Sequence, residues 1–554
     1  MMLSNLNLLA TAPGGVARLR ELILTLAVQG KLVPQDPADE PASVLLQKIR
    51  AEKDRLIAEG KIKKDKQLAA IAEEEKPFEL PMGWSFCRLG DLLLSIRSGG
   101  TPSKQNPVYW GGDIPWASVK DLKFGEPLTD TQDRITIEGL QAGSQLAIAG
   151  SILICTRMGL GKIGEALIDV AINQDLKAVQ LGAGVHKQHF INFFKTLSVV
   201  GSGMTVAGIK QDELLGFVVP LPPEAEQSRI VARVEELMRL CDALEAKGQL
   251  EATQHAQLLS TLLGTLTASA TPEELAENWQ RVAQHFDLLL DRPQAIDALE
   301  QTLLQLAVRG LLVPQDPADE PASVLLQKIR AEKDRLIAAG QIKRDKPLPP
   351  VTDEEQPFEL PVGWEWGRLE QLSIAIVDCP HSTPKFVESG RLCLDTNSFK
   401  QGVLLPHKLR FVDDSTFVER NARLAPQPGD LVFAREGSVG ESILIPDGVD
   451  ACLGQRVMLF RFSTQVSKEF VRLAISSTSF LDALLAMHKG IGAKHVNVGD
   501  MRKAVIPLPP LFEQSRIVTR VTQLRRLCAD LRQRLAEREV VQARLAEALA
   551  QSVA

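Results

Sequence analysis

The stretch LVPQDPADEPASVLLQKIRAEKDRLIA occupies residues 32–58 of this 554-residue chain, and the same 27 residues recur unchanged at 312–338. The wider match covers residues 26–66 and 306–346, where 36 of 41 positions agree. An internal repeat of this length predicts a fold in which one supersecondary unit is built twice.

A second repeated block follows each copy of the first. VPLPPEAEQSRIV begins at Val219 and IPLPPLFEQSRIV at Ile506. Between the blocks lie two inserts that barely resemble each other, so the order is frame, insert, frame, repeated once. The predicted domains are an N-terminal helical frame (1–80), a globular domain (81–218), a central helical frame (219–360), a second globular domain (361–505) and a C-terminal helix (506–554).

The frames have helical periodicity and the inserts do not. Val16, Leu19, Ile23 and Leu26 follow helical spacing, and heptad stripes begin after each PLPP. Such stripes suit a helix–helix seam, although packing into a purely local core is the alternative. The inserts contain short β-rich runs such as SILICTR (151–157) and DLVFAR (430–435), bounded by glycine, which predict mixed α/β domains. The stripes are Ile230, Val234, Leu237, Cys241 and Leu244, and Ile517, Val521, Leu524, Cys528, Leu531 and Leu535.

Composition places the chain among soluble globular proteins, with 45% hydrophobic and 24% charged residues. It has no apolar run long enough to cross a bilayer and no signal peptide, so we expect a cytoplasmic protein without membrane contact. The seven cysteines form no CxxC pair, which argues against a zinc site or a disulfide framework.

Charge is divided unevenly along the chain. The net charge of −6 argues against a non-specific nucleic-acid binder. The inserts are nearly neutral, with 12 basic and 12 acidic residues from 85 to 219 and 17 and 16 from 365 to 506, which leaves −7 for the frames. A nucleic-acid site in the inserts therefore requires cations gathered on one face, and the acidic frames suit a protein partner better.

Several segments resemble a known family. The paired PLPPEAEQSRIV and PLPPLFEQSRIV blocks, with SGGTPSKQNPVYWGGDIPWASVKDL (98–122), resemble the specificity subunit of type I restriction–modification enzymes and the opening of its target recognition domain. The segment LAVQGKLVPQDP resembles the longer members, which have extra helices before the first recognition domain. The resemblance implies an α+β fold with a pseudo-twofold repeat, in which two recognition domains are spaced by long antiparallel, coiled-coil-like helices.

The resemblance also implies a function in phage defence. Such a subunit is not an enzyme and holds no cofactor: it binds double-stranded DNA, and each recognition domain reads one half of a bipartite, asymmetric site. Its frames recruit two methyltransferase subunits, which bind S-adenosylmethionine and methylate adenine. Two restriction subunits can join and use ATP and magnesium.

Comparing the two inserts selects candidate DNA-binding residues. GGTPSK (99–104) has a counterpart in HSTPK (381–385), ICTRMGLGKIG in FAREGSVG, and GSGMTVAGIKQ in HKGIGAKHVNV. These loops combine hydroxyls, lysines and a strand-end arginine, the residue types that contact phosphates and guanine. The alternatives are ordinary turns, strand-end salt bridges and, for the aromatic residue, the core. The candidates are Thr101, Ser103, Lys104, Tyr109, Lys120, Arg157, Lys162 and Lys210 in the first insert, and His381, Ser382, Thr383, Lys385, Arg435, Lys489 and Lys494 in the second.

Two local patterns suggest rival functions. GLGKIG (159–164) fits a dinucleotide-binding fingerprint, but the apolar EALIDVAINQ after it predicts a β-hairpin instead of the required helix. NPVY (106–109) is similar to the NPPY loop of adenine methyltransferases but lacks its second proline. A third reading is a helical assembly scaffold whose inserts bind protein or other ligands.

Overall fold

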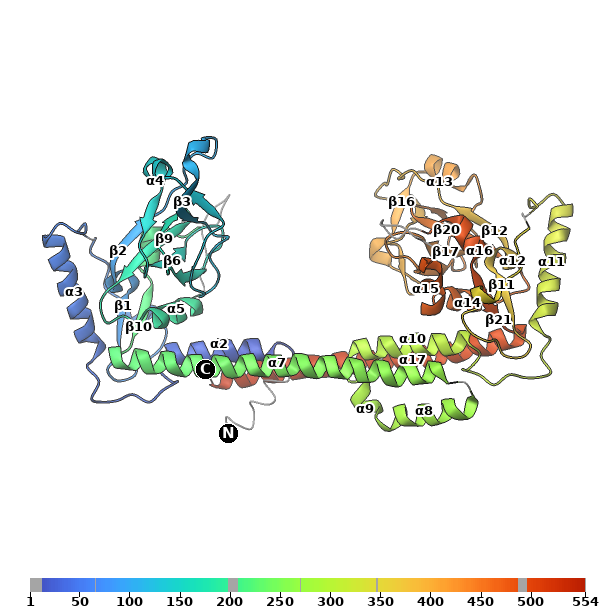
Figure 1. Ribbon diagram of the computed structural model, residues 1–554, viewed down its shortest axis with the longest axis horizontal. Helices are drawn as coiled ribbons and strands as arrows, with labels where there is room; N and C mark the ends of the chain where they lie inside the picture. The colour runs from blue at the N-terminus through green and yellow to red at the C-terminus, as the bar shows by residue number, and fades with distance from the viewer. Residues whose placement is uncertain are drawn as a thin grey trace. The chain divides into compact units, whose positions relative to one another are not determined.

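A computed structural model describes residues 12–64, 66–197, 208–269, 271–344, 347–486 and 496–553. The chain divides into two compact units. Unit 1 comprises residues 1–250 with 539–554, and unit 2 comprises residues 251–538. Each unit contains one globular domain and parts of both long helices (Figure 1).

The globular domain of unit 1 is built from three small sheets. Strand β1 (Ser85–Arg88) pairs antiparallel with β10 (Val218–Leu221), which closes the base of the domain. The other sheets have the orders β2-β9-β6-β7 and β4-β3-β8-β5. Their strands are β2 (Leu93–Ser98), β3 (Trp110–Ala117), β4 (Asp133–Ile135), β5 (Gln145–Ala147), β6 (Ile152–Cys155), β7 (Ile163–Glu165), β8 (Val170–Ile172) and β9 (Leu176–Leu181), with helices α4 (Ile137–Gly143), α5 (Lys187–Thr196) and α6 (Gln211–Leu215).

The globular domain of unit 2 repeats this plan. Strand β11 (Glu365–Arg368) pairs with β21 (Val505–Leu508), and the larger sheets have the orders β12-β20-β17-β18 and β16-β13-β19. The strands are β12 (Ser373–Asp378), β13 (Arg391–Leu394), β16 (Arg410–Val412), β17 (Leu431–Ala434), β18 (Ser442–Leu444), β19 (Ala451–Leu453) and β20 (Val457–Phe462), with a β14 (Phe399–Lys400) and β15 (Val403–Leu404) ribbon and helices α12 (Leu369–Leu372), α13 (Asp414–Asn421), α14 (Lys468–Ile475), α15 (Thr478–Ala486) and α16 (Val498–Lys503). Two inserts with little sequence in common therefore share one architecture, and the predicted α+β class is confirmed.

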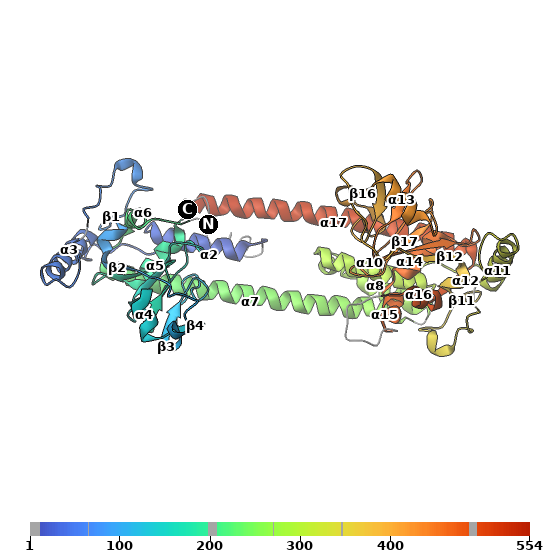
Figure 2. The same ribbon diagram turned by 90° about the horizontal axis from the view of Figure 1, so that it is seen from above.

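The frame helices form one local core in each unit. In unit 1, α2 (Gly15–Val28) lies between the start of α7 (Glu224–Ala268) and the end of α17 (Leu511–Val553), as Figure 2 shows. In unit 2, α10 (Pro293–Val308) packs with the start of α17 and the end of α7. Each unit thus holds the beginning of one long helix and the end of the other.

The predicted seam residues mostly lie in these cores. Ile230, Val234 and Cys241 are buried in the frame core of unit 1, and Cys528 and Leu535 in that of unit 2. Ile517 and Val521 are buried instead in the core of the second globular domain. Leu244 does not join the core, because its side chain is 41% exposed. Two further helices, α8 (Pro272–Gln284) and α9 (Phe286–Leu289), pack on the core of unit 2. No helix in the described part of the chain is long and apolar enough to cross a membrane.

The 27-residue repeat forms a loop and a helix that dock on the base of each domain. Helix α3 (Ala42–Ala58) and helix α11 (Ala322–Ala338) have the same sequence and the same buried positions. The preceding loop is held to the long helix by Asp39, whose Oδ2 accepts a hydrogen bond of 2.6 Å from Arg229. Asp319 and Arg516 form the same 2.6 Å contact in unit 2.

A buried carboxylate completes each docking site. Glu226, in the first turn of α7, is 1% exposed and accepts hydrogen bonds from Trp84 Nε1 (3.0 Å) and Gln35 Nε2 (3.2 Å). Burial raises the pKa of the Glu226 carboxyl, while the two donors act to lower it. We call this group the carboxylate joint; in unit 2 it consists of Gln315, Trp364 and Glu513, with the same two distances.

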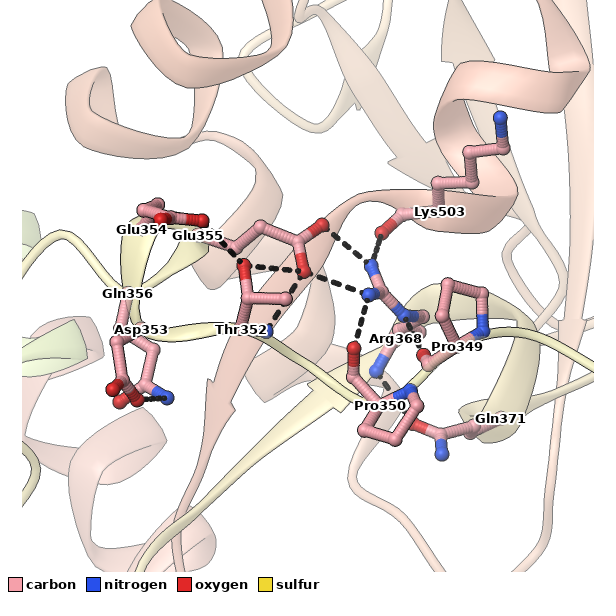
Figure 3. Close-up of polar contacts among 10 residues, drawn as sticks. All are labelled: Pro349, Pro350, Thr352, Asp353, Glu354, Glu355, Gln356, Arg368, Gln371 and Lys503. Carbon is pink, nitrogen blue, oxygen red and sulfur yellow. Dashed lines mark hydrogen bonds and ion pairs between the residues drawn. The ribbon is translucent and has the colours of Figure 1, made fainter.

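A buried arginine fastens the arm that leads from α3 or α11 into the globular domain. Arg368 donates to the carbonyl oxygens of Pro349, Pro350 and Lys503 and pairs with both carboxylate oxygens of Glu355 (Figure 3). The equivalent contacts in unit 1 use Arg88 and Glu75, and the guanidinium lowers the pKa of the Glu75 carboxyl to about 2. The arm is thus held from strands β1 and β11.

Ion pairs join the short frame helices to the long helices, α2 to α7 in unit 1 and α10 to α17 in unit 2. The arginine is on the short helix in unit 1 and on the long helix in unit 2. In unit 1, Arg20 of α2 pairs with Asp242 (2.6 Å) and Glu245 (3.1 Å) of α7. In unit 2, Arg532 of α17 pairs with Asp297 (2.6 Å) and Glu300 (2.8 Å) of α10. By the offsets of the two repeats, Glu300 occupies the position of Arg20, and Arg532 that of Glu245.

We predict that Trp84→Phe weakens the carboxylate joint of unit 1. The variant keeps the ring but removes a hydrogen bond to a buried charge, a loss of about 1.5–3 kcal/mol. Hydrogen exchange of amides at the start of α7 measures this change. Trp366→Phe is the matched control, because within the described residues the indole Nε1 of Trp366 has no hydrogen-bond partner. Equal effects of the two substitutions would contradict the assignment.

We also predict that Arg20→Glu lowers the thermal midpoint slightly, because it places three carboxylates together at exposed positions where a pair contributes roughly 0.2–1 kcal/mol. Adding Asp242→Ala and Glu245→Arg reproduces the arrangement of unit 2 and should restore the midpoint. A triple variant no more stable than Arg20→Glu would show that these pairs do not stabilise the contact.

Candidate nucleic-acid interface

Two groups of candidate residues meet in the first globular domain. The loop after β2 reaches the turn between β8 and β9, where the Gly100 amide donates to the Ile172 carbonyl at 2.9 Å. The end of β6 meets the same turn, since the Thr156 amide donates to the Asp175 carbonyl at 2.8 Å. A Cβ on Gly99 would lie 2.0 Å from the Asn173 carbonyl oxygen, so the close approach of this loop to the turn requires glycine.

The side chains at this junction form a polar cluster. Thr101 Oγ1 donates a hydrogen bond to the Gln174 side chain, and Arg157 Nε lies 3.7 Å from Asp175 Oδ1. The Arg157 side chain is 48% exposed. A bridge between Arg157 and Gly208 brings the segment of Lys210 alongside. Thr101, Arg157 and Lys210 therefore come from three loops that meet around one turn.

The second globular domain builds the same junction from different residues. The Gln455 side chain donates to the His381 carbonyl at 2.9 Å. The Arg435 amide donates to the Arg456 carbonyl, also at 2.9 Å, and the Arg435 carbonyl accepts a hydrogen bond of 3.0 Å from the Val496 amide. The loop after β12 and the end of β17 thus converge on the turn between β19 and β20.

Arg435 differs from Arg157 in its surroundings. Its side chain is 7% exposed, and Nη1 donates to Asp378 Oδ2 at 2.7 Å. The strand-end salt bridge, which was the alternative for both arginines, is therefore what Arg435 forms. In this conformation Arg435 does not present its guanidinium to a ligand at the surface.

The other candidates fall into three groups. Lys104, Lys120 and Lys385 are exposed, as are Ser103, Ser382 and Thr383, whereas Tyr109 is partly covered. Lys162 is partly covered and its Nζ donates to the Val119 carbonyl at 2.9 Å, so it braces a neighbouring loop. Lys489 and Lys494 lie outside the described residues.

The glycine-rich segment GLGKIG joins two antiparallel strands, β6 and β7. Its counterpart EGSVG joins β17 to β18 in the same way. The predicted β-hairpin is confirmed, and this loop does not open the helix that a dinucleotide-binding fingerprint requires. The NPVY segment forms a short turn in which the Asn106 side chain accepts from the Val108 amide at 3.2 Å.

Comparison with known proteins identifies the family. Residues 81–254 and 405–538 match the type I restriction modification DNA specificity domain. Over 97% of its length the chain is 35% identical to the EcoEI specificity subunit and 36% identical to the EcoAI specificity subunit, both from Escherichia coli, and it covers 93% of each. The chain belongs to the type I restriction enzyme specificity subunits.

A solved chain described under the complex assembly and conformational transition of the type I restriction–modification system has a TM-score of 0.46 and 18% identity. The matched region covers 86% of the present chain and 99% of the solved chain. As a member of the family, this protein is a DNA-binding specificity subunit, and its two globular domains are target recognition domains.

Sequence reasoning missed the turn at the centre of each recognition domain. Asn173, Gln174 and Asp175 in the first domain correspond to Gly454, Gln455 and Arg456 in the second, because each set lies between matching strands. Both glutamines contact the loop that contains the predicted hydroxyl residues. Aligning INQDL with LGQRV, the segments that lead from one β-rich run into the next, was the available signal.

We predict that alanine substitutions at the two strand-end arginines have different effects on stability. Arg435→Ala removes the guanidinium from the Asp378 carboxylate, which is 17% exposed and keeps the His381 ring at 3.4 Å, and this costs roughly 3 kcal/mol. Arg157→Ala changes stability by less than about 0.5 kcal/mol. Thermal unfolding of the two variants, with hydrogen exchange to assign the domain, measures the difference. Equal destabilisation would show that the different burial of the two residues has no energetic consequence.

Proposed function

We propose that each recognition domain of this specificity subunit reads one half of a bipartite, asymmetric sequence in double-stranded DNA. The observation that supports this most directly is the shared junction with unlike side chains. Both domains place a polar loop, a strand-end arginine and a glutamine around one turn, yet Asp175 is replaced by Arg456. Two scaffolds of one design with different chemistry at the same place suit the reading of two different sequences.

The chemistry of the junction suits contact with bases. A glutamine amide forms two hydrogen bonds with adenine, and arginine does so with guanine. Gln174 and Arg157 are exposed in the first domain, and in the second Arg456 is exposed and Gln455 partly covered. Arg456 adopts a left-handed conformation, with φ of 63°, and its Nε lies 3.1 Å from Glu436. Lys104 and Lys120 are exposed on neighbouring loops, where phosphate contacts position a protein without reading sequence.

We further propose that the chain is non-catalytic and that its duplicated frames recruit two methyltransferase subunits. S-adenosylmethionine would bind to those partners, and ATP and magnesium to any restriction subunits that join. The repetition of the frames supports two equivalent partners, and their net charge of −7 suits protein contact better than contact with DNA.

Mapping of adenine methylation in cells tests this function. Co-expressed with its methyltransferase subunit, the wild-type chain should direct methylation to one two-part sequence. Gln174→Ala should relax the choice of base in one half only, and Gln455→Ala in the other half only, because each amide pair contributes about 1–3 kcal/mol of discrimination.

Gln188→Ala is the matched control, since this glutamine contacts Asn192 within α5 and lies away from the junction. It should leave both half-sites unchanged. If the two junction variants relaxed the same half-site, the two domains would not read separate halves. If replacement of a whole recognition domain left the methylated sequence unchanged, the proposed function would be wrong.

A further inference from the structure

The outer faces of α3 and α11 are identical, although nothing in the fold requires them to be. Each helix buries its inner face: Leu45, Ile49 and Lys53 in α3, and the equivalent residues of α11. The residues that are exposed in both helices also agree without exception. They are Gln47, Lys48, Arg50, Ala51, Asp54, Arg55 and Ala58 in α3, and Gln327, Lys328, Arg330, Ala331, Asp334, Arg335 and Ala338 in α11.

The polar contacts on this face are repeated as well. Lys48 Nζ lies 2.5 Å from Glu40, and Lys328 Nζ lies 2.6 Å from Glu320. Arg50 pairs with Asp54 four residues later, as Arg330 does with Asp334. Both helices thus present the same side chains in the same paired arrangement.

The long helices show what happens to exposed positions when only the core is constrained. The buried residues at the start of α7 are kept in α17: Ile230, Val234 and Cys241 match Ile517, Val521 and Cys528. Of the nine exposed positions from 224 to 240, five have changed and four are kept. The changed residues are Glu224, Ala225, Ala232, Glu235 and Glu236, which are replaced by Leu511, Phe512, Thr519, Thr522 and Gln523.

Residues also differ between the two copies of the repeat immediately after α3 and α11 end. Glu59, Lys61 and Lys64 follow the helix and are replaced by Ala339, Gln341 and Arg344. Exposed substitutions usually alter stability by less than about 0.5 kcal/mol, so folding alone does not hold surface residues constant. A constraint other than folding therefore applies to the exposed face from residue 47 to residue 58.

We propose that these faces, which we call the repeat faces, are two copies of one docking surface, each for one copy of the same protein subunit. This inference rests on the proposed function for the partner, which is the methyltransferase subunit taken twice. A subunit encoded once must find the same surface at both places on the chain, whereas recognition domains that read different sequences must differ.

The charges on the repeat faces indicate the chemistry of the partner. Each repeat face has three exposed cations and one exposed carboxylate: Lys48, Arg50 and Arg55 with Asp54 in α3, and Lys328, Arg330 and Arg335 with Asp334 in α11. The partner's contact surface should therefore have an excess of carboxylates, which would steer its association. The interspersed acidic residues Glu40 and Asp54 favour a protein surface over DNA phosphates.

Variants that block one or both faces test the proposal in the complete chain. Ala51→Arg with Arg55→Glu adds bulk and reverses charge on α3, and Ala331→Arg with Arg335→Glu does so on α11. Native mass spectrometry of the complex with the methyltransferase subunit should give two bound subunits for the wild type, one for either blocked face and none when both are blocked. Ala142→Arg, at an exposed helical alanine of α4, is the control and should keep two.

A second measurement needs no variant. Hydrogen exchange of the wild-type chain should slow at both α3 and α11 when the methyltransferase subunit binds. Two subunits on the doubly blocked chain, or no slowing at either helix in a complex of two, would overturn the docking surface while leaving the proposed function intact. Fewer than two subunits on the wild type would instead refute the proposed function. Weaker DNA binding by the blocked chain with two subunits retained would assign the face to DNA and overturn the proposal.

Discussion

The structure depends on one buried carboxylate at the start of each long helix. Glu226 is desolvated, which disfavours its charge and raises its pKa, and two donors from segments far apart in the sequence offset part of that cost. Neither donor is dispensable, because a buried carboxylate that loses a partner is costly. The next residue, Gln227, accepts from the His186 amide at 2.7 Å and so joins α5 of the recognition domain to the same turn. Its counterpart Gln514 accepts from the Ser467 amide at 2.9 Å.

Gln227 and its counterpart Gln514 help to explain how two unlike domains fit one frame. The hydrogen bond that joins each recognition domain to the first turn of its long helix uses a backbone amide of the domain and a side chain of the frame. A backbone amide is available whatever residue stands there, and indeed a histidine in the first domain is replaced by a serine in the second. This hydrogen bond therefore places no demand on the side chain that the domain has at this position.

The sequence was sufficient for features that repeat or alternate regularly. The order of frame and insert, the hairpin around GLGKIG and most of the helical seam follow from such patterns. The surroundings of Arg435 could not be predicted, because Asp378 meets it only after β12 and β17 are brought together 57 residues apart in the chain. Leu244 fits the heptad but lies outside the core, since helical spacing predicts a face and not its length. Gln174 and Gln455 stayed hidden because their importance comes from a turn shared by three segments.

The frame has two carboxylate joints of the same composition. This raises the question of how the short helices α2 and α10 each pack against the correct part of α7 and α17. The carboxylate joints are the same in both units, so they do not distinguish correct from exchanged pairing. The reversed ion pairs do: exchange would place Arg20 beside Arg532, and Glu300 beside Glu245, where like charges repel. Each such pair is exposed and weak, but discrimination requires only a difference between two arrangements, and reversal changes attraction into repulsion at both contacts together. The carboxylate joints, which hold the frame together, are therefore the same in both units. The ion pairs of Arg20 and Arg532, which favour the correct pairing of helices, differ between them.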